Sequence, residues 1–227
     1  MDRTSWYNKL YDNYGKEWDP KVLSKEKQGC IKKALALIGT GKKVLDVGCY
    51  NGYISSLIKQ QGNDVLGIDM SDKSVELCKK KGITCIQHDL ETKLPFKDKE
   101  FDVVFMGEII EHIFDTDGLI KEAKRILRKD GFLVLTTPNL AALSRRIKLL
   151  FGKNPDIEDG LFPVEKNSGH IRYFTACTLR KLLKRDGFTP VLLTGDVILL
   201  KFFTSFKLAD VFPTFSWTLV VKAVPEN

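Results

Sequence analysis

The sequence contains few cysteines and no long apolar run, and these shortages exclude several classes of protein. Five cysteines among 227 residues, with no C-x-x-C pair, are not expected to form a disulfide framework or a cysteine zinc site. The first residues lack the apolar stretch of a signal peptide. The most apolar segment, residues 197–217, is interrupted by charged residues and proline, which argues against a membrane-spanning helix. We therefore expect a cytoplasmic protein.

Acidic residues are outnumbered by basic ones, since 36 Lys+Arg against 29 Asp+Glu give a formal net charge of +7. This balance is compatible with RNA, an acidic lipid surface or a phosphorylated substrate as a partner. The lysines are spread along predicted helices, however, so a solvated basic surface is the preferred interpretation. The length and the 43% hydrophobic content predict a single globular domain spanning residues 1–227.

Short apolar runs alternate with helical patterns along the first two thirds of the chain. Strands are predicted at residues 43–47, 65–69, 83–86, 101–106 and 132–137, and helices at 24–38, 52–61, 72–81 and 117–129. Ser71 is expected to cap the third of these helices and Gly131 to stop the fourth. Such alternation indicates a doubly wound α/β sandwich, with a mostly parallel sheet covered on both faces.

The last third of the chain has a different pattern. Residues 140–151 predict a basic helix, 152–170 a loop that is a candidate lid, and 175–186 another helix. Strand patterns near 190–199 and 215–223, joined by a non-helical link, predict an antiparallel pair at the edge of the sheet. A phenylalanine cluster at residues 202–215 is interpreted as core, with an acceptor pocket or a lipid-contacting surface as alternatives.

A glycine turn follows the first predicted strand and reads Asp46-Val47-Gly48-Cys49-Tyr50-Asn51-Gly52. Glycines let the backbone approach a ligand closely, and the next helix offers its N-terminal N–H groups. The acid at Asp46 suits an ammonium group better than a phosphate. Asp69 and Asp89 follow the next two strands, where carboxylates can bind ribose hydroxyls and the adenine amine. Each acid could instead be a helix cap or a turn residue, but three at one sheet edge indicate a nucleoside site.

In combination, these motifs resemble those of class I S-adenosylmethionine-dependent methyltransferases, in the group that includes the ubiquinone-pathway O-methyltransferases. The resemblance covers roughly residues 30–190 and rests on the segments 44–52, 67–69, 88–90, 101–104, 108–112 and 127–139. It implies a Rossmann-like three-layer sandwich with a seven-stranded sheet, in which an antiparallel final strand lies near 215–223. It also implies S-adenosylmethionine as the cofactor.

The resemblance further implies roles for individual residues. Gly48 and Gly52 would approach the methionine part of the cofactor, Asp69 would hold the ribose, and Asp89 with Leu90 would contact the adenine. The full set of expected cofactor contacts is Asp46, Gly48, Cys49, Tyr50, Gly52, Asp69, Met70, Asp89, Leu90, Met106 and Tyr11. Tyr11 belongs to an aromatic segment, residues 1–25, that is interpreted as a helical lid or as ordinary packing. Tyr50 replaces the glycine usual in the family, and we expect its ring to turn outward.

A second motif, Glu108-x-x-Glu111-His112, would share one helix face if a helix began there. Similar residues occur in the ubiquinone-pathway O-methyltransferases and in small-RNA 2′-O-methyltransferases, where a later histidine completes a magnesium site. His170 lies at about that position. We predict Glu111, His112 and His170 as catalytic residues. These three and Glu108 are also candidate metal ligands, but we expect no metal because magnesium prefers oxygen ligands.

The predicted reaction is methylation of a hydroxyl group carried by a small molecule or a glycan. The acceptor pocket is expected from residues 1–20, 140–170 and 197–215. One alternative is a magnesium-dependent RNA 2′-O-methyltransferase, which the basic charge would suit, and another is a non-catalytic nucleoside-binding protein. A nicotinamide-dependent oxidoreductase is disfavoured by the absence of a G-x-G-x-x-G pattern.

Overall fold

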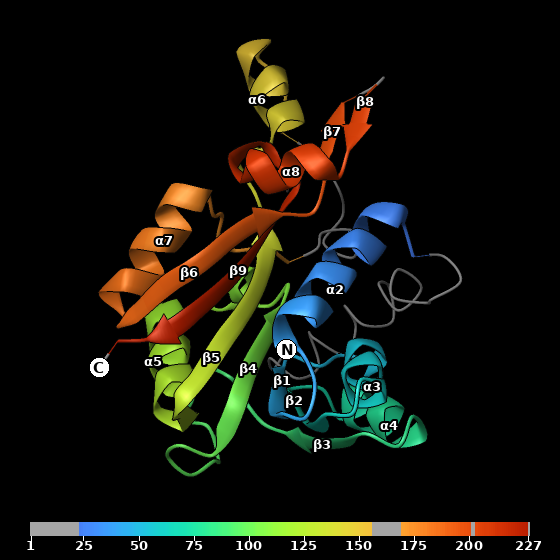
Figure 1. Ribbon diagram of the computed structural model, residues 1–227, viewed down its shortest axis with the longest axis vertical. Helices are drawn as coiled ribbons and strands as arrows, with labels where there is room; N and C mark the ends of the chain where they lie inside the picture. Colours follow the sequence, from blue (N-terminus) through green and yellow to red (C-terminus); the bar gives the residue numbers. More distant parts are fainter. Residues whose placement is uncertain (1–22, 156–168, 201–202, 227) are drawn as a thin grey trace.

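Seven strands in the order β3-β2-β1-β4-β5-β9-β6 form the central sheet (Figure 1). The structure is a computed structural model, and it describes residues 23–155, 169–200 and 203–226. The strands are β1 Lys43–Val47, β2 Asp64–Asp69, β3 Thr84–Gln87, β4 Phe101–Gly107, β5 Leu127–Pro138, β6 Phe188–Gly195 and β9 Thr218–Pro225. The first five strands are parallel, whereas β9 is antiparallel to both of its neighbours, β5 and β6.

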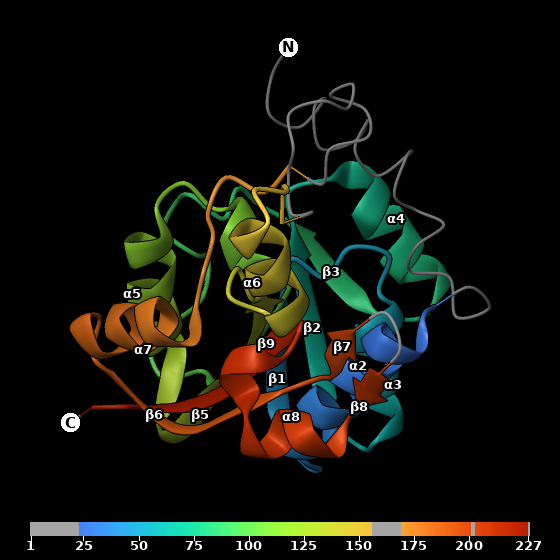
Figure 2. The same cartoon turned by 90° about the horizontal axis from the view of Figure 1, so that it is seen from above.

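Helices cover both faces of this sheet. They are α2 Lys25–Ile38, α3 Tyr53–Gln60, α4 Asp72–Lys80, α5 Thr116–Ile126 and α7 Ala176–Arg185. Figures 1 and 2 show α2, α3 and α4 on one face and α5 and α7 on the other. Successive strand residues point to opposite faces, so Val44 and Val103 pack with α2 and α3, while Leu45 and Val104 pack with α5 and α7. The predicted doubly wound three-layer sandwich is therefore confirmed.

Several short elements gather where the parallel strands end at their carboxyl edge. They are η1 Ile110–His112, α6 Leu143–Leu150, β7 Ile198–Leu200, β8 Phe203–Ser205, α8 Lys207–Val211 and η3 Pro213–Phe215. In Figure 1, α6, α8 and the β7–β8 hairpin form the upper end of the molecule, beyond the tip of β5. Ligands of open α/β sheets bind at this edge, so the fold itself points to it.

The helix caps follow the sequence closely. Ser71 caps α4 as predicted, because its side chain accepts a hydrogen bond from the N–H of Ser74. Thr175 and Thr178 form a reciprocal capping box at the start of α7. These two helices flank opposite faces of the sheet, so their fixed starting points help to fix the loops that precede them.

The predicted end of the helix near residue 129 is wrong. Helix α5 ends at Ile126, and Leu127 already pairs with Phe101 as the first residue of β5. Gly131 therefore lies within β5 and is not a helix stop. A Cβ atom there would lie 2.9 Å from the carbonyl oxygen of Asp102, so a close backbone approach explains this glycine.

Two predictions for the C-terminal region also need correction. Strands β6 and β9 are antiparallel, but β9 lies inside the sheet and only β6 is at its edge. Their link contains the helix α8 and the β7–β8 hairpin, so it is not devoid of helix. The aromatic residues Phe203, Phe206 and Phe212 are exposed and do not form core.

The N-terminal segment 1–25, which includes Tyr11 and was predicted as a helical lid, lies outside the described residues for all but its last three positions. Within residues 23–226, apart from the two undescribed gaps, we find no helix with the length and apolar character needed to span a bilayer.

Candidate active site

Three left-handed residues shape the turn after β1. Gly48, Tyr50 and Gly52 have φ angles of 72°, 48° and 71°. This conformation costs a residue with a side chain more than it costs glycine, so Tyr50 is held there against its own preference. A Cβ atom at Gly48 would lie 2.6 Å from Cδ1 of Ile109, and one at Gly52 would lie 2.9 Å from Sγ of Cys78. Packing within the protein thus requires both glycines.

Asp69, the last residue of β2, holds this turn in place. One carboxylate oxygen accepts the backbone N–H of Tyr50 at 2.9 Å, and the other accepts that of Ser71 at 2.9 Å. The side chain is buried. A carboxylate can accept about four hydrogen bonds, so one side chain can serve two neighbouring backbone N–H groups at once. Asp69 therefore connects the glycine turn to the start of α4.

Asp46 lies within β1 and faces α3. Its Oδ2 atom accepts a hydrogen bond of 2.5 Å from the hydroxyl of Ser55, and its side chain is buried. Burial raises the pKa of Asp46 to about 7, although the bond from Ser55 acts in the opposite direction. Burial disfavours the anionic form of this carboxyl group. A nearby cation, such as the ammonium group of an amino acid, would stabilise that anionic form.

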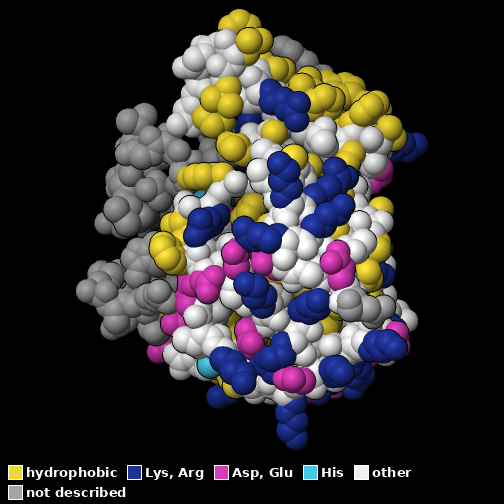
Figure 3. Space-filling model, turned by 90° about the vertical axis from the view of Figure 1, so that its left-hand side faces the viewer, with side chains coloured by type: hydrophobic (Ala, Val, Ile, Leu, Met, Phe, Trp, Pro, Cys, Tyr) yellow, Lys and Arg dark blue, Asp and Glu magenta, His cyan; other side chains and the backbone are white. Residues whose placement is uncertain are grey.

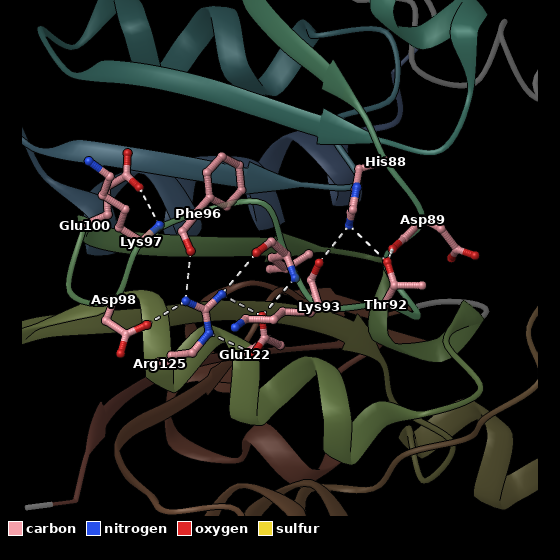
Figure 4. Close-up of polar contacts among 11 residues, drawn as sticks. His88, Asp89, Thr92, Lys93, Phe96, Lys97, Asp98, Glu100, Glu122 and Arg125 are labelled. Carbon is pink, nitrogen blue, oxygen red and sulfur yellow. Dashed lines mark hydrogen bonds and ion pairs between the residues drawn. The ribbon is translucent and has the colours of Figure 1, made fainter.

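Asp89 begins the connection between β3 and β4. Its Oδ1 atom accepts the N–H of Glu91 at 3.0 Å, and Figure 4 shows the carboxylate pointing away from His88. Leu90 beside it is buried. The ring nitrogen Nε2 of His88 lies 3.0 Å from the hydroxyl of Thr92. His88 thus helps to shape this loop.

Arg125 of α5 anchors the rest of the same connection (Figure 4). Its guanidinium group donates to the carbonyl oxygens of Leu94 at 3.1 Å and Phe96 at 2.8 Å. It also pairs with the carboxylates of Glu122 and Asp98, each at 2.7 Å. Planar guanidinium groups fix several acceptors in one geometry, so Arg125 holds the segment that presents Asp89.

Three thiols pack against one another beneath the glycine turn. Sγ of Cys49 lies 3.7 Å from that of Cys78 and 3.3 Å from that of Cys85. All three side chains are buried among apolar neighbours such as Ile83. Gly67 makes room for them, because a Cβ atom there would lie 2.6 Å from Sγ of Cys49. The Cys49 side chain therefore serves packing in this structure.

Glu111, His112 and His170 come together at the carboxyl edge of β4 and β5. One possible ligand atom from each lies within 4.8 Å of the others. The rings of His112 and His170 have centroids 4.8 Å apart, and Nε2 of His170 lies 3.9 Å from Oε1 of Glu111. The N–H groups of Ile171 and Arg172 donate to the carbonyl oxygen of Glu111 at 2.9 Å and 3.0 Å, which docks the His170 segment on η1.

Glu108 does not share a helix face with Glu111, contrary to the prediction. It has a left-handed φ angle of 53° and precedes η1, which contains only three residues. Its carboxyl group is nevertheless close enough to influence that of Glu111 electrostatically. A backbone turn at Glu108, and not helical spacing, therefore brings its charge near the carboxyl group of Glu111.

Burial and like charge shift the ionisation of this cluster. The pKa of Glu111 is raised well above its usual value by burial and by the charge of Glu108, and burial raises the pKa of Glu108 to about 7. The pKa of His170 is lowered to about 3 by burial and by the neighbouring His112 and Arg145. Within the described ranges of the chain, the Oε1 atoms of both glutamates have no hydrogen-bond partner. Each of these buried oxygens would be stabilised by a cation or a hydrogen-bond donor placed beside it.

Known proteins resemble this chain in sequence and in fold. The sequence profile of a family described as a methyltransferase domain matches residues 23–193, about three quarters of the chain. This chain belongs to the class I S-adenosylmethionine-dependent methyltransferases. Residues 23–193 of this methyltransferase include β1 to β5, the glycine turn and the Glu111–His112–His170 cluster.

The methyltransferase also has curated relatives. It is 39% identical over 101 residues to a "Ubiquinone biosynthesis O-methyltransferase" of Pelagibacter ubique, a match that covers 43% of this chain and 42% of that protein. It is 30% identical over 167 residues to a "Probable S-adenosylmethionine-dependent methyltransferase" of Mycobacterium tuberculosis, covering 73% of this chain and 55% of the relative. The chain thus spans about half the length of the curated relatives it matches.

Solved structures share the fold of this methyltransferase at low sequence identity. A SAM-dependent methyltransferase from Thermotoga maritima superposes with a TM-score of 0.70 at 18% identity, over 97% of this chain and all of that one. The 1,6-didemethyltoxoflavin-N1-methyltransferase of Burkholderia thailandensis, with bound S-adenosylhomocysteine, superposes with a TM-score of 0.64 at 17% identity, over 100% of this chain and 92% of that one. At these identities the likeness concerns the fold alone.

The structure of this methyltransferase brings most of the predicted cofactor residues to one edge. Asp46, Asp69 and Asp89 lie at or after the carboxyl ends of β1, β2 and β3, and the glycine turn lies between the first two. Met70 follows β2, and its carbonyl oxygen accepts a bond of 3.2 Å from Gln87. Met106 is fully buried on the α5 side of the sheet. The roles of these residues toward a cofactor remain predictions.

Arg145 of α6 is only 4% exposed, and its burial was not predicted from the sequence. Its guanidinium group donates to the carbonyl oxygen of Asn139 at 2.6 Å and lies 4.1 Å from the ring centroid of Trp217. Burial lowers the pKa of Arg145 to about 10, while Glu108 and Asp196 act against that shift. Among the basic residues of a helix that looks solvent-exposed, no sequence signal singled it out. Asp196, which lies between β6 and β7, is also buried, and no sequence signal pointed to it.

Proposed function

We propose that this chain transfers the methyl group of S-adenosylmethionine to a hydroxyl oxygen of a small-molecule or glycan acceptor. The observation that carries the proposal is the meeting of two groups of side chains at one sheet edge. The acids Asp46, Asp69 and Asp89 surround the glycine turn, and the Glu111–His112–His170 cluster follows β4. The ubiquinone-biosynthesis O-methyltransferases among the relatives support oxygen as the acceptor atom.

The acids at this edge match the chemistry of the cofactor. Asp69 is positioned to accept hydroxyl donors, and Asp89 stands on a loop that Arg125 immobilises. Asp46 is a buried carboxyl group whose pKa of about 7 would fall beside an ammonium group. When bound, S-adenosylmethionine supplies a methyl group on a sulfonium, and its transfer to the acceptor oxygen leaves neutral S-adenosylhomocysteine.

His112 is the proposed base for the hydroxyl proton. Its Nδ1 atom lies 3.1 Å from the carbonyl oxygen of Gly169. A carbonyl oxygen can only accept, so Nδ1 carries the hydrogen and the lone pair of the neutral ring lies on Nε2. That nitrogen would take the proton as the acceptor oxygen bonds to the methyl carbon. His170, with its pKa of about 3, stays neutral and so does not repel a sulfonium.

The same cluster has a donor set suitable for a divalent cation. Glu111, His112 and His170, with Glu108 nearby, would hold the ion, and the buried oxygens of the glutamates would gain a partner. Such an ion would lower the pKa of an acceptor hydroxyl. This second candidate includes magnesium-dependent methylation of an RNA 2′-hydroxyl. Turnover that survives an excess of chelator would exclude it.

The proposed cofactor site is tested by calorimetry with S-adenosylhomocysteine. We expect Asp69→Asn to weaken binding at least tenfold, because an amide replaces half of the acceptor capacity with donors. The matched control is Asp64→Asn, which changes an exposed carboxylate at the opposite end of β2 and should bind like the wild type. Absence of binding by the wild-type protein, or equal binding by both variants, would contradict the proposal.

A further inference from the structure

Large apolar side chains are exposed at the end of the molecule that carries α6 and α8. On α6 and its following turn, Leu149, Leu150 and Phe151 are 54%, 79% and 71% exposed. On β8, α8 and the next residue, Phe203, Val211 and Phe212 are 46%, 67% and 49% exposed. We call these six residues the apolar cap. Figure 3 shows hydrophobic side chains gathered at this upper end, with basic side chains among them.

The two halves of the apolar cap belong to one surface. Arg146 of α6 donates to the carbonyl oxygen of Thr214 at 3.0 Å, and its guanidinium group lies 4.8 Å from the ring centroid of Phe215. These contacts join α6 to η3, which directly follows α8. Figures 1 and 2 both show α6, α8 and the β7–β8 hairpin at the same end of the protein.

Helix α6 has its polar and apolar residues in an inverted arrangement. Its one buried residue is Arg145, whereas Ile147, Leu149 and Leu150 are exposed. A helix on a soluble protein normally turns its apolar stripe toward the core. An apolar face directed outward, on a helix anchored by a buried cation, indicates that the face meets an apolar environment outside the chain.

Bases outnumber acids in the described segments that carry the apolar cap. In residues 143–155 and 203–215, all of them described by the structure, Arg146, Lys153 and Lys207 are exposed bases. The only acid in these ranges is Asp210, and it is paired with Lys33 at 2.6 Å. An apolar surface bordered by bases complements a bilayer with anionic headgroups, in which acyl chains lie just beneath the charges.

We propose that the apolar cap docks on a lipid bilayer that carries anionic headgroups. The aliphatic side chains would enter the boundary between headgroups and acyl chains, and the bases would contact the headgroups. Half of the cap is aliphatic, namely Leu149, Leu150 and Val211, and these side chains offer no ring for the base stacking by which single strands are bound, which favours lipid over nucleic acid. The cap lies at the carboxyl edge of the sheet, so docking would bring the proposed active site close to the membrane. The docking itself does not depend on the proposed methyl transfer.

Vesicle sedimentation with the full chain tests the docking. We expect partitioning onto phosphatidylcholine vesicles that contain phosphatidylglycerol to exceed partitioning onto pure phosphatidylcholine by roughly a hundredfold, from about fivefold for each of the three exposed bases. Added salt should reduce the difference. The double variant L150E/F151E should lose binding to both kinds of vesicle. The control V191E/L192E, which changes exposed residues of the edge strand β6, should bind like the wild type.

Calorimetry with S-adenosylhomocysteine on the same variants separates this proposal from the proposed function. Unchanged nucleoside binding by L150E/F151E, together with lost vesicle binding, supports docking by the cap. Vesicle binding that is equal for both double variants overturns the proposal. So does a wild-type protein that binds RNA but no vesicles, or one that forms dimers through the cap in light scattering and binds no vesicles.

Discussion

Asp46 shows how a single buried carboxyl group links pH to stability. Its pKa is about 7 in the folded protein, against about 3.9 for an unfolded aspartate, so folding takes up a proton between these values. The stabilisation that this group contributes is full below about pH 4 and is lost as the pH rises through 7. We expect Asp46→Asn, which cannot ionise, to exceed the wild type in free energy of unfolding at pH 8 by a few kcal/mol. At about pH 3.5, below the pKa of the unfolded aspartate, the two should be nearly equal in urea titrations. The same pH dependence in both proteins would show that Asp46 ionises without penalty.

His112 is the residue at which loss of catalysis should separate from loss of binding. Removing a general base typically lowers turnover by about 10²- to 10⁴-fold. We expect that loss in kcat for His112→Gln, with an unchanged affinity for S-adenosylhomocysteine, whereas Asp69→Asn should change the affinity. The two variants thus serve as controls for each other when kcat and binding are measured together. An unchanged kcat in His112→Gln would exclude the imidazole as the base.

The sequence indicated the positions of Asp46, Asp69 and Asp89 because strand ends are easy to locate. Carboxyl ends of parallel strands meet at one edge, so acids that follow three such strands had to be neighbours. The convergence of Glu111 with His170 was predicted only through family resemblance. It depends on two backbone hydrogen bonds from Ile171 and Arg172, and spacing in the sequence does not reveal such bonds.

At the scale of elements, β2, α4 and β3 meet the glycine turn around three thiols. We expect Gly67→Ala to destabilise the protein by about 1–3 kcal/mol, because its Cβ atom would lie 2.6 Å from Sγ of Cys49. Adding Cys49→Ala should recover most of that loss, since it removes the sulfur atom. Urea unfolding of the two single variants and the double variant measures the coupling. Additive effects would mean that the contact does not limit packing here.

Helices were harder to orient than strands. The strands β1 and β4 are apolar on both faces because helices cover both faces of the sheet, so their orientation did not have to be predicted. The pattern of α6, by contrast, fits a surface helix with basic residues outward, and the structure buries Arg145 and exposes Leu150. Ring stacking on Trp217, more than 70 residues away in sequence, decides this orientation. Contacts of that range are not encoded in the local pattern.

At the scale of the whole molecule, buried acids collect at the carboxyl edge of the sheet. The pKa values of Glu108 and Asp196 are raised to about 7 and about 6 by burial, and burial and the charge of Glu108 also raise the pKa of Glu111 well above its usual value. S-adenosylhomocysteine at about 100 times its Kd should stabilise the fold by about 2.7 kcal/mol, or raise Tm by roughly 5–10 °C. Since its ammonium group would offset the charge of Asp46, the rise at one fixed ligand concentration should be larger at pH 8 than at pH 6. Thermal unfolding at both pH values checks this, and Asp69→Asn should show little rise at either.

The placement of β9 has a consequence for synthesis. This strand comes last among the described elements, yet it separates β5 from β6 inside the sheet. A nascent chain emerges from the ribosome with its N-terminal part first. Until residues 218–225 emerge, β5 has an open edge and β6 has no strand to pair with. The last strand therefore completes the sheet. A chain whose synthesis stopped before β9 would expose an unpaired strand edge, which can pair with other chains, beside the incomplete active site.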